Sequence, residues 1–142
     1  MLFRSIPNEV PALDCDCNEF EGISFFSDGI QLSKHFNLGQ LSSRAVVVKE
    51  KVAAQRGLTT GQIVCNLKNL AVNCLDKIKD KYPDMIVTNA FRLDVASRSN
   101  VSDHGMGMAA DLQFPSIRPS QYYEIINWIA ENVPYKIGRA HV

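Results

Sequence analysis

Neither sign of charge predominates in this sequence of 142 residues, in which 15 Lys and Arg residues are balanced by 15 Asp and Glu residues. A protein without net charge has no long-range field that would attract nucleic acid or an anionic membrane surface. Apolar runs as long as the ~18 residues of a membrane-spanning helix are missing as well. We therefore expect neither a nucleic-acid partner nor insertion into a membrane.

The N-terminal residues lack the apolar core of a secretory signal peptide. Export would need another route, unless the native protein begins elsewhere, and the sequence leaves the localisation open. Internal repeats and low-complexity tracts are also missing. With 46% apolar and 21% charged residues, the composition is typical of a globular protein, and the length suits one domain.

Four cysteines are present, but their spacing fits no zinc-binding quartet. Cys15 and Cys17 are separated by one residue, which is closer than in the usual paired zinc ligands. Cys65 and Cys74 are nine residues apart in an expected helix, on opposite faces. We expect buried thiols, or an exposed and incidental Cys15/Cys17 pair, and no disulfide framework.

Apolar periodicity indicates helices followed by short strands. Apolar residues recur at helical spacing over 61–81, where Thr59 or Thr60 can cap the start and Pro83 ends the helix. Residues 90–103 form a polar loop that is long for a compact domain. We expect an arm or linker over 1–29, helices over about 44–55, 61–81 and from Pro119 to near Pro134, and strands over 85–89 and about 108–114.

The most informative motif is Ser-x-His-x-x-Gly-x-Ala-x-Asp over 102–111. Strand alternation places Gly107, Ala109 and Asp111 on one face, where the two small residues leave an open floor. His104, in the loop that enters the strand, can fold back to meet the Asp111 carboxylate. Ser102 can orient the His104 ring, or it is a simple turn serine.

A neutral imidazole and a carboxylate are both good zinc ligands, with bonds of about 2.0–2.2 Å. We therefore predict that His104 and Asp111 bind Zn²⁺. A catalytic zinc site holds three protein ligands and a water molecule, and a carboxylate base takes the proton of that water. The pattern thus predicts a further histidine and a further Glu or Asp.

The motif resembles that of the zinc D-Ala-D-Ala carboxypeptidase/dipeptidase family, which includes vancomycin-resistance dipeptidases, many phage endolysins and, as non-enzymatic relatives, hedgehog signalling domains. His104 and Asp111 match the first two zinc ligands of the family. The resemblance covers about 30–135, closely over 87–115 and loosely elsewhere. It implies an α+β fold in which helices pack on a small antiparallel sheet, as in the hedgehog/D,D-peptidase fold.

Residues 87–92 are similar to the family strand that ends in Ser-Gly-Tyr-Arg, although this chain has Asn-Ala-Phe-Arg. Arg92 matches the arginine that steadies the substrate or the transition state, a task that suits the planar fork of a guanidinium. The alternative is a solvated surface arginine. We count Arg92 as a catalytic and substrate-binding residue, and Ser102 as a second substrate-binding candidate.

The third zinc ligand of the family is a histidine on a later strand, preceded by the glutamate base. His141 is a poor match, because it directly follows the last expected helix and Gly138 stands where a carboxylate is needed. Residues 137–142 also read as the translation of a widely used sequencing adapter. We expect an incomplete domain over 30–136 that lacks its C-terminal strands, followed by an adapter-encoded tail.

The resemblance implies that the parent protein is a zinc-dependent D,D-carboxypeptidase or endopeptidase that cleaves peptidoglycan stem peptides. Phage origin is expected because residues 32–41 are similar to the lead-in of phage and bacterial members and because a signal peptide is missing. Phage tail proteins are candidate partners. The alternative is a non-catalytic member of the same fold, used as a structural or binding module of a phage tail. A third interpretation is a soluble domain without metal. We expect the 142-residue chain alone to be inactive.

Overall fold

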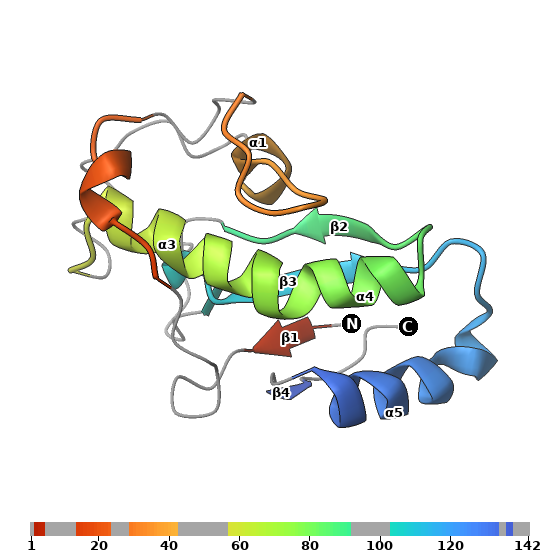
Figure 1. The fold of residues 1–142 in the computed structure, drawn as a ribbon. Helices are drawn as coiled ribbons and strands as arrows, with labels where there is room; N and C mark the ends of the chain where they lie inside the picture. Colours follow the sequence, from red (N-terminus) through yellow and green to blue (C-terminus); the bar gives the residue numbers. More distant parts are fainter. Residues whose placement is uncertain are drawn as a thin grey trace.

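The computed structural model describes residues 2–4, 14–23, 29–42, 57–91, 103–133 and 136–137. Its sheet has four strands in the order β2-β3-β1-β4, and every pair is antiparallel. The strands are β1 (Leu2–Arg4), β2 (Ile86–Asn89), β3 (Ala109–Gln113) and β4 (Lys136–Ile137). Helices pack on this sheet (Figure 1), so the predicted α+β class is confirmed.

One long helical rod crosses the sheet and consists of α3 (Thr60–Leu70), a π-helical segment η2 (Ala71–Leu75) and α4 (Asp76–Lys81). Thr59 begins it with a capping box, because its hydroxyl accepts from the Gln62 backbone N–H while the Gln62 amide oxygen accepts from the Thr59 N–H. The predicted helix over 61–81 is thus confirmed. So are the strands predicted over 85–89 and about 108–114, each to within a residue or two.

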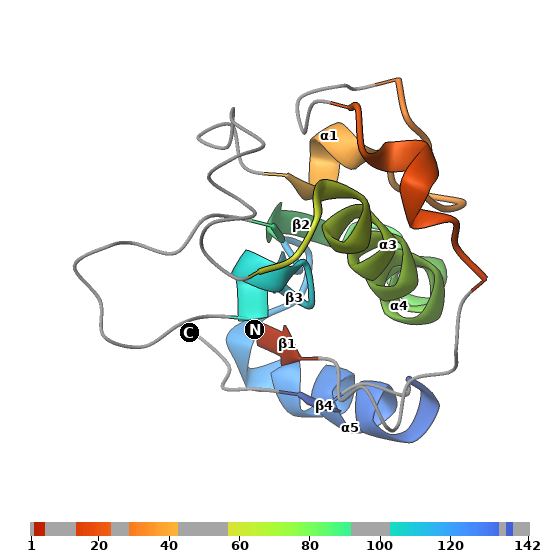
Figure 2. The same ribbon diagram turned by 90° about the vertical axis from the view of Figure 1, so that its left-hand side faces the viewer.

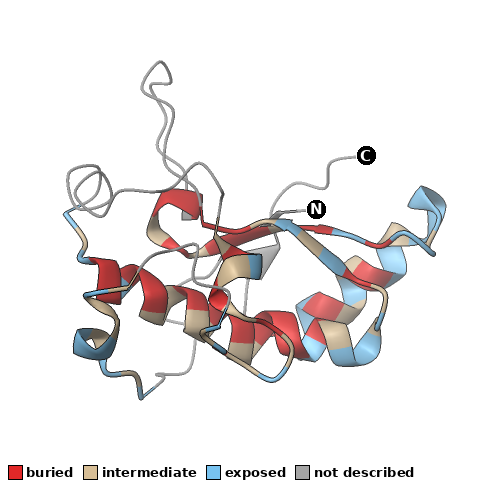
Figure 3. Cartoon of the chain, turned by 90° about the horizontal axis from the view of Figure 1, so that it is seen from above, coloured by how far each residue is buried: buried red, intermediate tan, exposed pale blue. Residues whose placement is uncertain are grey.

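The core lies between this rod and the sheet. The rod contributes a stripe of fully buried residues at helical spacing, namely Ile63, Leu67, Leu70, Cys74 and Ile78. Figure 3 shows buried residues along the length of α3 and in the strands. Each large side chain in such a position contributes about 1.5–3 kcal/mol relative to an exposed one, so this stripe fixes the rod on the sheet.

The last helix is α5 (Tyr122–Asn132), which begins after a short 3-10 turn η4 (Pro119–Gln121). Its beginning at Pro119 and its end before Pro134 agree with the prediction. It contacts β4 and lies at the β1–β4 end of the sheet, away from β2 (Figures 1 and 2). The helix predicted over about 44–55 lies outside the described residues.

The described parts of the expected arm over 1–29 pack into the domain. β1 occupies an inner position of the sheet, between β3 and β4. The 3-10 turn η1 (Cys17–Phe20) lies against α3, and the Glu21 carboxylate accepts a hydrogen bond of 3.1 Å from the Gly61 backbone N–H. A side chain at Gly61 is impossible in this arrangement, since its Cβ would lie 1.9 Å from the Cys17 carbonyl oxygen.

A disulfide joins Cys15 to Cys65, and the expectation that the chain has no disulfide is therefore wrong. The two cysteines are 50 positions apart, and only the docking of η1 on α3 brings them together. Cys74 is a buried thiol as expected, and burial raises its pKa far above the ordinary value. Cys17 is a half-buried thiol. Within the described residues, no helix is long and apolar enough to span a bilayer.

Candidate metal centre

His104 lies in a short 3-10 turn, η3 (Asp103–Met106), that is docked on α3. Gly107 closes the turn with a φ of +74°, a conformation that L side chains rarely adopt. A Cβ on Gly107 would lie 2.9 Å from the Ile63 carbonyl oxygen, so the turn touches the helix backbone directly. Asn66 Nδ2 adds a hydrogen bond of 2.9 Å to the Met106 carbonyl oxygen. Backbone conformation and one side chain of α3 thus position the turn.

The His104 ring is buried, with 2% exposure, and its orientation is set by the backbone. Nδ1 lies 2.6 Å from the Ala90 carbonyl oxygen. A carbonyl oxygen only accepts hydrogen bonds, so Nδ1 carries the proton that it donates. In the neutral ring, Nε2 is then the atom with the lone pair, and it is directed toward Asp111. This arrangement, in which a backbone carbonyl fixes the tautomer, is typical of metal-binding histidines.

Asp111 occupies the middle of β3, and its side chain is 30% exposed. Its neighbours Ala110 and Leu112 are buried, as the predicted alternation requires, but Ala109, which was predicted to share an open face with Asp111, is buried as well. Opposite Asp111 the register of β2 shifts between Val87 and Asn89, so β2 has an irregularity at this point. Such bulges often re-aim side chains beside functional sites, and this one immediately precedes Ala90.

The structure brings the two predicted ligands together, with His104 Nε2 3.5 Å from Asp111 Oδ1. Two ligand atoms bonded at about 2.0–2.1 Å to a tetrahedral zinc ion lie about 3.3–3.4 Å from each other. The separation therefore fits a shared zinc ion.

The other two predicted site residues, Arg92 and Ser102, lie outside the described residues, as does His141, which the sequence disfavours as a third ligand. In the part of the chain that is described, no cluster of three or more His, Cys, Asp or Glu side chains could hold a metal ion. The described site therefore consists of the two predicted ligand side chains, His104 and Asp111, and their supports.

Sequence reasoning missed two supports of His104. The Ala90 carbonyl is a backbone group, and the sequence gives no sign of it. Asn66 follows Cys65 within α3 and reads as an ordinary polar residue of an amphipathic helix. Only its hydrogen bond to Met106 reveals its task.

No protein-family model matches the chain, and neither a curated protein nor a solved structure matches it. A functional assignment therefore depends on the motif and on the geometry of the two ligands.

Proposed function

We propose that the protein from which this chain derives is a zinc-dependent D,D-peptidase that hydrolyses peptide bonds of peptidoglycan. The observation that carries the proposal is the pairing of His104 Nε2 with Asp111 Oδ1 at 3.5 Å, with the His104 tautomer set by the Ala90 carbonyl. The motif over 102–111, which resembles the zinc D-Ala-D-Ala carboxypeptidase/dipeptidase family, supports the same conclusion.

In this proposal His104 and Asp111 hold zinc, and Arg92 binds a carboxylate or carbonyl oxygen of the stem peptide. Bound zinc supplies a Lewis acid and a water molecule that is acidic enough to lose its proton near neutral pH. The burial of His104 prevents the ring from turning, so Nε2 keeps its direction through a catalytic cycle. A third histidine ligand and a carboxylate base would complete such a site.

The test is zinc analysis and hydrolysis of purified peptidoglycan by the protein expressed from its gene as read in genomic DNA. We expect stoichiometric zinc and release of D-alanine or of cleaved cross-links. His104→Ala and Asp111→Ala should each abolish hydrolysis and weaken zinc binding at least about tenfold, because each removes a ligand. Lys77→Met, at an exposed position of α4, is a control that should change neither.

Two outcomes would contradict the proposal. Bound zinc without hydrolysis would identify a non-catalytic binding or structural module of the same fold. Absence of zinc would identify a domain without metal. The 142-residue chain alone should bind zinc weakly and hydrolyse nothing. Stoichiometric zinc in that chain would instead mean that it contains a third ligand, for which His141 is a candidate.

A further inference from the structure

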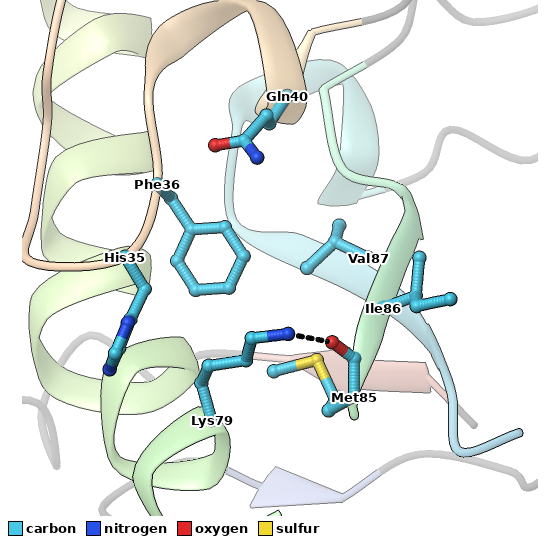
Figure 4. Close-up of a pocket in the computed structure, with 7 residues that line it drawn as sticks. All are labelled: His35, Phe36, Gln40, Lys79, Met85, Ile86 and Val87. Carbon is cyan, nitrogen blue, oxygen red and sulfur yellow. Dashed lines mark hydrogen bonds between the residues drawn. The ribbon is translucent and has the colours of Figure 1, made fainter. Parts of the chain in front are cut away.

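A pocket of about 390 Å³ lies at the Met85 end of β2, near the start of the strand, whereas the His104–Asp111 pair lies beyond its other end. Its walls come from α1 (Leu38–Leu41) and the loop before it, from α4 and from β2 (Figure 4). This volume is within the range of small-molecule sites, about 300–1,000 Å³.

The loop that forms one wall is fixed in place by a buried carboxylate. Asp76, at the start of α4, accepts hydrogen bonds from the Ser33 hydroxyl at 2.9 Å, from the Lys34 backbone N–H at 3.0 Å and from the His35 backbone N–H at 3.1 Å. These bonds hold the loop against α4, and the buried Phe36 ring then faces β2 across the pocket (Figure 4). The pocket is therefore formed before any ligand arrives.

The interior of the pocket is mainly apolar. Phe36, Met85 and Val87 turn their side chains toward one another (Figure 4). Ile86, on the opposite side of β2, is 48% exposed and stands at the edge. Burial of an apolar group between these side chains is favourable at about 25 cal/mol per Å².

The polar groups of the pocket are donors. Lys79 Nζ donates to the Met85 carbonyl oxygen at 2.7 Å, which uses one of the three ammonium protons. The amide oxygen of Gln40 accepts a hydrogen bond from the Asn37 backbone N–H, and its NH₂ group is the part that reaches the pocket (Figure 4). No acidic residue is among the described side chains that line the pocket.

The nearby Asp80 does not neutralise Lys79. Its carboxylate instead accepts from His35 Nε2 at 2.6 Å and from Lys34 Nζ at 3.0 Å. Asp84 is the described carboxylate whose charge interacts with Lys79, but it accepts its hydrogen bonds from Ser116 and does not line the pocket. The described residues that line the pocket therefore offer the ammonium group no acidic partner inside it.

We propose that this pocket binds a small monocarboxylate with an apolar chain. The carboxylate accepts hydrogen bonds from Lys79 Nζ and from the Gln40 amide, and the chain packs among Phe36, Met85 and Val87. The proposal is independent of the metal centre, because none of these residues contacts His104 or Asp111 through a described hydrogen bond.

The test is a titration of the 142-residue chain with hexanoate, followed by the methyl NMR signals of Met85, Ile86 and Val87. We expect saturable shifts of these methyl groups. Hexylamine, with the same chain and the opposite charge, should not bind, and acetate should bind at least about tenfold more weakly because it lacks the apolar chain. Equal binding of hexylamine, or shifts that do not saturate, would overturn the proposal.

Variants locate the site. Lys79→Met should weaken hexanoate binding about tenfold, since a charged hydrogen bond is lost, while Lys79→Arg should largely preserve binding. Lys77→Met, on the same helix but outside the pocket, is the matched control and should bind as the unaltered chain does. Unchanged affinity in Lys79→Met would place the ligand elsewhere and refute the proposal. A melting curve of each variant shows whether it is folded. If a variant does not fold, the comparison of hexanoate, hexylamine and acetate on the unaltered chain still tests the proposal.

Discussion

Two short turns dock on the same helix, α3, in different ways. η1 is tied to the helix covalently, through the Cys15–Cys65 disulfide, with the Glu21–Gly61 hydrogen bond beside it. η3, which carries His104, is held by the close approach of Gly107 to Ile63 and by the hydrogen bond of Asn66. The difference separates two tasks: η1 stabilises the fold as a whole, and η3 sets the direction of one imidazole ring.

The largest effect on stability is expected from breaking the covalent attachment. Cys15→Ser opens a loop closed over 50 positions, and loop-closure entropy for that length predicts a loss of about 4 kcal/mol in the free energy of unfolding. Urea denaturation measures it. Cys17→Ser, a free cysteine of the same turn, is the control and should change little. A Cys15→Ser protein as stable as the unaltered chain would show that η1 contributes nothing to global stability.

The second prediction concerns the orientation of the His104 ring, and its effect on the free energy of unfolding should be smaller than that of Cys15→Ser. Gly107→Ala forces a side chain into a left-handed conformation and against the Ile63 carbonyl, which should cost about 1–3 kcal/mol and displace His104 from Ala90. Side-chain ¹⁵N NMR of histidine reports whether Nδ1 still carries the proton.

Gly57→Ala is the matched control for this substitution. Gly57 has a φ of +67°, but nothing lies within 4 Å of the place its Cβ would occupy. It should therefore show the cost of the conformation alone, with the His104 signals unchanged. If the His104 signals are the same in Gly107→Ala as in Gly57→Ala, contact with α3 does not orient the ring.

A third and smaller change concerns the hydrogen bond that ties η3 to α3. Asn66→Ala should cost about 1 kcal/mol, because one hydrogen bond to a backbone carbonyl is lost. If the protein binds zinc as proposed, Asn66→Ala should also weaken zinc binding, since the turn that carries His104 becomes looser. Asn73→Ala, which breaks the Asn73–Asn69 pair on the same rod, should reduce stability without changing zinc affinity. An equal loss of zinc affinity in both variants would argue against a positioning role for Asn66.

Acid should have the smallest effect on stability and should leave both turns, η1 and η3, docked on α3. Hydrogen bonds from His35 and Lys34 lower the pKa of Asp80, and hydrogen bonds from Ser116 lower that of Asp84. A lowered pKa in the folded state means that the contribution is present above the ordinary value of 3.8 and is lost as the pH falls through the folded value. Both carboxylates are exposed, so solvent screens the effect. Melting temperatures of Asp80→Asn and Asp84→Asn should converge with that of the unaltered chain below pH 3.8.

Periodicity in the sequence predicted the elements that carry most of the core. Residues at helical spacing over 61–81 and the alternation of Ala110 and Leu112 with Asp111 reflect burial directly, and both agree with the structure. The pairing of His104 with Asp111 was predictable for the same reason, because strand geometry and motif spacing are local properties.

Features that depend on distant parts of the chain were not predictable. Cysteine spacing contains no information on a pairing over 50 positions, so the disulfide was missed. β1 has only three residues, too few to show an alternation, and its place in the sheet depends on pairing with β3. Gly107 was expected to leave an open floor for a substrate, whereas its described role is a left-handed turn against Ile63.

The π-helical segment Ala71–Leu75 divides the rod into two halves with different roles. The half before it holds the His104 turn through Ile63 and Asn66. The half after it supplies Lys79 to the pocket and Asp76 to the loop that forms one pocket wall. A π-turn contains one residue more than an α-turn. Removing one residue there would turn one half about 100° relative to the other, since each α-helical residue advances the helix by that angle. The relative orientation of the His104–Asp111 pair and the pocket therefore depends on the number of residues in the π-helical segment.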